Sequence, residues 1–134
     1  MDQKVEKIFN KAKKAVNENE RLNNLITEAT EKIKTSKFDN NYFSELVEYV
    51  GLMSRMVLAH LKGEYRAFSN KSLLMMVFGL LYFITPTDLI PDFMPGLGFA
   101  DDISIIYYII KTIREDVIAF QEWENSVVEI ENNQ

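Results

Sequence analysis

The stretch of sequence that decides the fold is TPTDLIPDFMPGLGFADD, from Thr85 to Asp102. A strongly apolar segment lies on each side of it: LLMMVFGLLYFI, residues 73–84, comes before it, and ISIIYYIIKTI, residues 103–113, comes after it. Thr85 ends the first segment as a helix, because a residue that precedes a proline is pushed out of the α region. Two further prolines and two glycines keep the connection irregular. We therefore predict two helices joined by a rigid turn, a hairpin over residues 72–114.

The first helix of this hairpin has no polar face. A helix that is apolar all round is either the central helix of a core or a membrane segment. As helices, residues 73–84 would extend about 18 Å and residues 103–113 about 16 Å, whereas the hydrocarbon core of a bilayer is about 30 Å thick. Neither helix is long enough to cross a membrane alone.

A re-entrant hairpin inside a membrane is the alternative. The cations around the hairpin collect at its open end, as expected if both ends lie on the cytoplasmic face: Lys62, Arg66 and Lys71 before it, Lys111 and Arg114 after it. Such an insertion would bring the carboxylates of the turn to hydrocarbon depth, which is costly. We therefore favour a soluble or peripheral protein whose turn stays in water.

The first 62 residues are predicted to form amphipathic helices that cover the hairpin. Apolar residues recur there at helical spacing: Val5, Ile8, Phe9, Ala12 and Val16, and then Leu22, Leu25, Ile26, Ala29 and Ile33. One long helix would place Asn19 in a heptad seam, a pattern of self-associating coiled coils. A break at residues 17–20 would instead give two helices that pack on a globular core. We favour the globular core, and both the choice between one helix and two over residues 3–36 and homo-oligomerisation through the seam stay open.

A third helix is predicted to start at residues 39–41 and to end before a capping Gly63. Gly51 interrupts this helix at a cost of about 1 kcal/mol relative to alanine, which predicts a close helix crossing there. Ser69 or Asn70 is predicted to cap the start of the next helix.

The last long helix is predicted to begin at Asp101 or Asp102, where a carboxylate can accept orphan backbone N–H groups or lie in the first turn. Residues 129–134 are predicted to form a frayed tail. The inner stripe of this helix comprises Ile103, Ile106, Tyr107, Ile110, Ile113, Val117, Phe120 and Trp123. Because no segment alternates like a strand between hairpin turns, we predict a single all-α domain over residues 1–134, a bundle of about four to five helices around the apolar hairpin.

Composition limits the functional classes. The 134 residues include no cysteine, which excludes thiolate catalysis and Cys-ligated zinc or iron–sulfur sites. The N-terminal sequence lacks the apolar run of a secretory signal, so we expect a cytoplasmic protein, with a peripheral position at the inner membrane as an option. The net charge of −5 divides into +3 for residues 1–71 and −8 for residues 72–134. An acidic chain without an apparent Lys/Arg cluster on one face argues against nucleic acid as a partner.

The run PTDLIPDFMPGLGFADD, residues 86–102, resembles the signature of the YkvA-like domain-of-unknown-function family. That pattern comprises a proline, a variable residue, Asp-Leu-Ile-Pro-Asp, a second proline, a glycine and a pair of aspartates. The resemblance covers about Met56 to Ile113, and nothing similar is identified for residues 1–50. It implies a short helical hairpin, often on or in membranes, with no established reaction.

Four aspartates surround the turn, Asp88, Asp92, Asp101 and Asp102, and they are the only charged residues in the range 72–110. Carboxylates around a Gly/Pro-rich loop are suitable ligands for Ca²⁺ or Mg²⁺, although their spacing fits no EF-hand loop. We favour the interpretation that each aspartate caps a backbone end. A divalent-cation site is the alternative, and no other cofactor is predicted.

Catalytic groupings are not apparent in the sequence. His60 is the only histidine, and no base is placed by spacing beside Ser72 or Ser104. Paired carboxylates can do acid–base chemistry, but they need a cleft that nothing in the sequence predicts. We therefore predict a protein that is not an enzyme and has no catalytic residues.

The turn also carries apolar residues that its prolines make difficult to bury, namely Phe93, Met94, Leu97 and Phe99. Exposed together, they would form an apolar tip of the kind found at partner or membrane contacts. We therefore expect a non-enzymatic interaction module that contacts a protein partner or the inner membrane surface through this tip. A divalent-cation-binding domain that uses the Asp-rich turn is the alternative.

Overall fold

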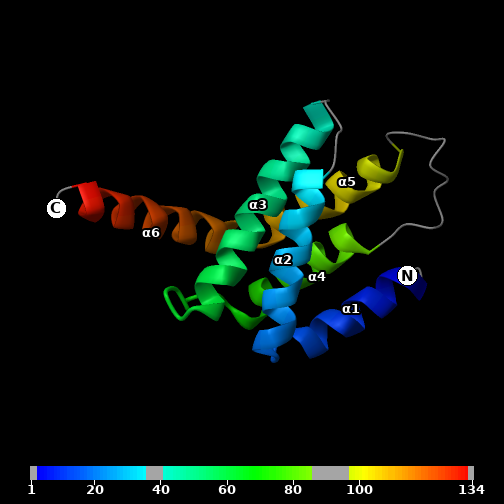
Figure 1. Cartoon of the computed structure of the whole chain (residues 1–134), viewed down its shortest axis with the longest axis horizontal. Coiled ribbons are helices and arrows are strands. Elements are labelled where there is room, and N and C mark those ends of the chain that lie inside the picture. Colours follow the sequence, from blue (N-terminus) through cyan, green and yellow to red (C-terminus); the bar gives the residue numbers. More distant parts are fainter. Residues whose placement is uncertain (1–2, 36–40, 86–96, 133–134) are drawn as a thin grey trace.

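The computed structural model describes residues 3–35, 41–85 and 97–132, without the side chains of residues 4, 41–43 and 97–104. Six helices occupy these ranges: α1 Gln3–Ala15, α2 Asn19–Thr35, α3 Asn41–Leu61, α4 Asn70–Ile84, α5 Leu97–Thr112 and α6 Arg114–Asn132 (Figure 1). The described residues contain no strand, which confirms the all-α prediction for them. The predicted count of four to five helices is too low, because the chain breaks at residues 16–18 and again at Ile113.

Helix α4 is the centre of the molecule. It contacts α1, α2, α3 and α5, and its buried residues lie all round the helix: Ser72, Leu73, Met76, Val77, Phe78, Gly79, Leu80 and Phe83. Ser69 is its N-cap, and the Ser69 hydroxyl accepts a hydrogen bond from the Ser72 backbone N–H at 3.1 Å. Thr85 is its C-cap, as predicted, and donates its backbone N–H to the Leu81 carbonyl at 3.0 Å. The helix that is apolar all round is therefore a core helix, enclosed by its own chain.

The N-terminal segment forms two helices, which decides the question that the sequence left open. α1 runs antiparallel to α4 (Figure 1), with the Phe9 and Phe78 rings 5.7 Å apart in an edge-to-face contact. α2 then packs on both α3 and α4. Asn19 is exposed at the start of α2 and does not lie in a coiled-coil seam. The apolar residues of the predicted seam are instead buried in the core of the same chain, among them Ile8, Ala12, Ala15, Leu22 and Ala29.

The close helix crossing lies at Gly79 of α4, and its prediction at Gly51 is wrong. A β-carbon added to Gly79 would lie 3.0 Å from Ile109 Cδ1 and 3.2 Å from Met53 Sδ, so α3 and α5 both approach α4 there. A β-carbon on Gly51 would have only the Arg55 guanidinium near it, at 4.0 Å. Gly79 lies in a run so apolar that its sequence context does not distinguish it from its neighbours.

The connection from α3 to α4 follows the prediction. Gly63 has φ 75°, in the left-handed region that favours glycine, just after α3 ends. Its N–H donates to the His60 carbonyl, and the Glu64 N–H donates to the Ala59 carbonyl at 2.9 Å. These two bonds satisfy carbonyls at the end of the helix in the manner of a Schellman motif.

The C-terminal segment departs most from the prediction. α5 begins at Leu97, four residues before Asp101, because Gly98 costs little in a first turn whose N–H groups have no intrahelical partners. Ile106 and Ile109 of α5 are buried, as is Ile113 just after its end, whereas Tyr107, predicted to face inward, is exposed. After the break at Ile113, α6 continues past Glu129 to Asn132, where a frayed tail was predicted. Figure 1 shows the second half of α6 extending away from the other helices.

Candidate functional site

Of the eight residues predicted to form the site, four lie outside the described part of the chain and four lie in α5. Asp88, Asp92, Phe93 and Met94 fall in residues 86–96, of which the structure gives no description. Leu97, Phe99, Asp101 and Asp102 lie in the first turns of α5, with their side chains undescribed. Asp101 and Asp102 are therefore not at the N-cap position, which precedes Leu97. The metal site and the apolar tip stay predictions.

The C-terminal end of α4, from which the predicted turn begins, receives a cation from α2. The Lys32 ammonium donates to the Phe83 backbone carbonyl and lies 4.7 Å from the centre of the Phe83 ring. A cation at this end is favoured because the last carbonyls of a helix carry partial negative charge. The Thr85 hydroxyl donates to the Leu81 carbonyl at 2.6 Å. Two carbonyls at the end of α4 therefore accept hydrogen bonds from side chains, one from Lys32 and one from Thr85.

The exposed face of α1 carries a lysine stripe, which we define as Lys7, Lys11 and Lys14. These residues are all exposed and follow the spacing i, i+4, i+7, so they share one face. Lys11 also lines a groove that includes Leu81 and Ile84 of the last turns of α4, with Ala15, Arg21, Asn24, Leu25 and Glu28 completing it. This stripe was not predicted, although the spacing of the three lysines is visible in the sequence.

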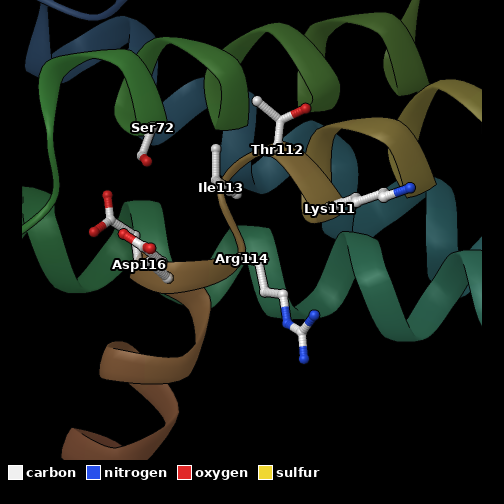
Figure 2. A pocket seen from close by; sticks show the side chains of 7 residues that line it. Ser72, Lys111, Thr112, Ile113, Arg114 and Asp116 are labelled. Carbon is white, nitrogen blue, oxygen red and sulfur yellow. The ribbon is translucent and has the colours of Figure 1, made fainter.

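A polar pocket lies where α5 meets α6 (Figure 2), lined by Ser72, Lys111, Thr112, Ile113, Arg114, Glu115 and Asp116. Asp116 and Ser72 lie toward each other, whereas the Lys111 and Arg114 side chains extend away from them (Figure 2). The Asp116 carboxylate accepts hydrogen bonds from the backbone N–H and the hydroxyl of Ser69, at 3.1 Å and 3.2 Å. The pocket is therefore a junction in which the first turn of α6 holds the N-terminus of α4.

The pKa of the Asp116 carboxyl reports this junction. Partial burial on its own raises the pKa, but hydrogen bonds from the Ser72 side chain and from the backbone and side chain of Ser69 outweigh it. The net result is a pKa below the usual value of an aspartate. The carboxylate is thus held charged by its partners, which is typical of a structural contact and not of a general acid.

His60 lies beside a second groove, lined also by Lys13, Val16, Asn17, Asn70, Leu73 and Leu74. Burial, and then the charge of Arg66, lower the pKa of the imidazole. Its Nδ1 atom is buried without a hydrogen-bond partner in the described structure, and its ring lies 6.5 Å from that of Phe68. A half-buried histidine that contacts an aromatic ring has a packing role here.

The described residues contain no group of three or more His, Asp or Glu side chains that could hold a metal ion. In the same residues, no helix has both the length and the apolarity required to cross a membrane.

Comparison with known proteins finds a family model that matches this hairpin. Residues 72–108, which span most of α4 and most of α5, match the model of a family described as "Protein of unknown function (DUF1232)". We call residues 72–108, over which this match extends, the DUF1232 segment. The chain is also 29% identical over 77 residues to the "Uncharacterized membrane protein YkvA" of Bacillus subtilis (strain 168). That alignment covers 58% of this chain and 73% of the relative. No solved structure matches the chain.

These matches support the YkvA-like resemblance that the turn sequence suggested. In the structure, the DUF1232 segment supplies the central helix α4 and the helix that packs against it, α5. The α1 and α2 helices, which lie outside the segment, cover α4 and carry the cations near its C-terminal end. The DUF1232 segment of this protein is therefore embedded in helices that the family match does not include.

Proposed function

We propose that the protein is a non-enzymatic helical module that associates with the inner membrane surface from the cytoplasm. One observation carries the proposal: Lys11 of the lysine stripe lines a groove with Leu81 and Ile84, at the end of α4 that leads into the predicted apolar tip. Cations near the end of a helix that leads into a predicted apolar segment suit a surface that offers both anionic headgroups and hydrocarbon, since each Lys near such a surface contributes about 1 kcal/mol. The name of the Bacillus subtilis relative, which calls it a membrane protein, supports a membrane location.

The burial of α4 supports attachment to the surface over insertion. The apolar residues of α4 pack against α1, α2, α3 and α5, so inserting α4 into lipid would require the core to open. A module bound through α1 and the tip would keep that core intact.

Vesicle binding tests the proposal. We expect the protein to sediment with vesicles of phosphatidylcholine and phosphatidylglycerol, and more weakly with phosphatidylcholine alone. Replacing the three lysines (Lys7→Gln, Lys11→Gln, Lys14→Gln) should weaken binding to the anionic vesicles by about 1 kcal/mol per lysine. Phe93→Asp should abolish binding to both kinds of vesicle without lowering the melting temperature.

A matched control variant carries Lys62→Gln, Arg66→Gln and Lys71→Gln, which removes the same charge around the opposite end of α4, where these side chains are also exposed. It should bind anionic vesicles nearly as well as the wild type. A wild type that binds neither vesicle, or a control that loses as much affinity as the lysine-stripe variant, would contradict the proposal.

Cell fractionation gives an independent test. A peripheral protein should be released from membranes by a high-salt or carbonate wash, because such washes disrupt contacts with headgroups but leave inserted helices in place. Retention in the pellet after carbonate would show insertion instead.

A further inference from the structure

Among the described residues, the large hydrophobic side chains that are exposed all lie on α5 and α6. The large hydrophobic side chains exposed there are Tyr107 (54%), Tyr108 (65%), Ile118 (44%), Val128 (53%) and Ile130 (59%). None of the described residues of α1 to α4 is of this kind. Helices that enclose a core normally turn polar residues to solvent, so an exposed apolar side chain such as Ile118 indicates a face of α6 that is covered in the working form of the protein.

Other elements of the same chain pack against only one side of α6. Phe120 is buried and Trp123 is half-buried, under the rings of Tyr65 and Phe68: Tyr65 lies 5.4 Å from Phe120 and 5.2 Å from Trp123. The opposite side of the helix, where Ile118 is exposed, has no described element packed on it, and the last turns of α6 extend clear of the body (Figure 1).

The charges around Ile118 have an order that suits a second copy of the same helix. Arg114, Ile118 and Glu122 follow each other at intervals of four residues and therefore share one face. All three side chains are exposed, and neither Arg114 nor Glu122 forms an ion pair with another described residue. The face thus has a cation on one side of an apolar residue and a carboxylate on the other.

A face of this kind is complementary to itself when two copies run antiparallel. With the two-fold axis at Ile118, residues whose numbers are equally far from 118 come opposite each other. Arg114 then meets Glu122 of the partner subunit at both ends of the contact, and the two Ile118 side chains meet at the axis.

We propose that two copies of this chain associate through the outer face of α6, antiparallel about an axis at Ile118. A two-fold contact uses the same surface on both copies and closes at the dimer. A partner bearing charges of one sign would match only half of the face, and an anionic membrane would repel Glu122 and the carboxylates that follow it. The contact is distinct from the α1–α2 seam considered in the sequence analysis, and it does not depend on membrane binding.

Sedimentation velocity of the full chain over a range of concentrations tests the proposal. The wild type should show a monomer–dimer equilibrium, and Ile118→Glu should raise its dissociation constant at least tenfold, because it places two carboxylates at the axis. Asn24→Glu, an exposed change on α2, should leave the dissociation constant unchanged. A wild type that remains monomeric at all concentrations, or an Ile118→Glu variant that dimerises as the wild type does, would overturn the proposal.

A charge exchange tests the antiparallel register. Arg114→Glu alone and Glu122→Arg alone should each weaken the dimer, because each places like charges opposite one another. The double variant should recover most of the wild-type affinity, and a double variant as weak as the sum of the two single changes would overturn the register.

The absence of cysteine from the chain allows a direct check of the axis. Ile118→Cys should form a covalent dimer readily on mild oxidation, since the two residues would lie within the distance of about 7 Å that a disulfide requires. Asn24→Cys places an exposed cysteine on α2, away from the proposed axis, and should form a covalent dimer only slowly. Equal rates for the two variants would overturn the proposal. Circular dichroism melting of each variant distinguishes a lost interface from a lost fold.

Discussion

Asp116 joins the ends of two helices through a chain of short polar contacts. Its carboxylate accepts from the backbone N–H and the hydroxyl of Ser69, while the Ser69 hydroxyl accepts from the Ser72 N–H at the start of α4. Asp116 also lies in the first turn of α6, where a negative charge is favoured by the helix dipole. One carboxylate therefore stabilises two helix N-termini and fixes the direction in which α6 leaves the core.

Asp116→Asn should lower the free energy of unfolding by about 1 kcal/mol at pH 7. The substitution keeps the shape of the side chain but removes its charge, and hydrogen bonds to a charged group are worth roughly 1 kcal/mol more than neutral ones. Urea unfolding of the two proteins measures the difference. Glu115→Gln, an exposed neighbour in the same turn, should change the stability by less than about 0.5 kcal/mol.

The contribution of Asp116 to the free energy of unfolding should disappear at acidic pH. Because the folded state lowers the pKa of this carboxyl, its contribution is fully present above the pKa of the unfolded chain and is lost as the pH falls through the pKa of the folded state. Unfolding curves of the wild type and of Asp116→Asn should therefore converge at low pH. A stability difference that stays constant from neutral to acid pH would show that the charge is not what the junction uses.

Among the elements, those ended by a local backbone signal were predictable and those positioned by packing were not. Ser69, Thr85 and Gly63 mark helix ends as predicted, because a capping hydroxyl, a following proline and a left-handed glycine act within one turn. The outward position of Tyr107 depends instead on how α5 lies against α3 and α4. The break at Ile113 has no proline or glycine beside it, so the sequence predicted a single helix where the structure has α5 and α6.

The two glycines in helices α3 and α4 should respond oppositely to alanine. Gly79→Ala should lower the free energy of unfolding by about 1 kcal/mol, because crowding against the fully buried Ile109 and Met53 outweighs the gain in helix propensity. Gly51→Ala should raise it by up to about 1 kcal/mol, because its β-carbon would enter open space. Thermal unfolding of both variants checks the pair, and a stabilised Gly79→Ala protein would show that Met53 can move aside.

At the scale of the whole molecule, the sequence predicted which helix is central, but it did not predict which apolar face is left exposed. An apolar helix surrounded by amphipathic helices is visible in hydrophobic spacing, and α4 is that helix. The cations near the end of α4 come from α1 and α2, residues far away in the sequence, so only the packing reveals that they converge there. The exposed face around Ile118 could not be predicted for a related reason. Whether a side chain is exposed depends on which other elements pack against it, and residue spacing alone does not show this.

Amide hydrogen exchange should rank the helices by how much of their own chain encloses them. The amides of α4 should exchange slowest, at the rate set by global unfolding, because four helices cover it and must separate before water reaches it. Residues 126–132 of α6 should exchange fastest among the described helices, because they extend beyond the body and their opening disturbs nothing else (Figure 1).

Measurement by mass spectrometry at low protein concentration keeps association from slowing the exchange. Raising the concentration should then protect the residues around Ile118 while leaving α1 and α2 unaffected. If α4 exchanged as fast as the end of α6, the apolar helix would not be the centre of a cooperative core, and its burial would not oppose insertion into a membrane.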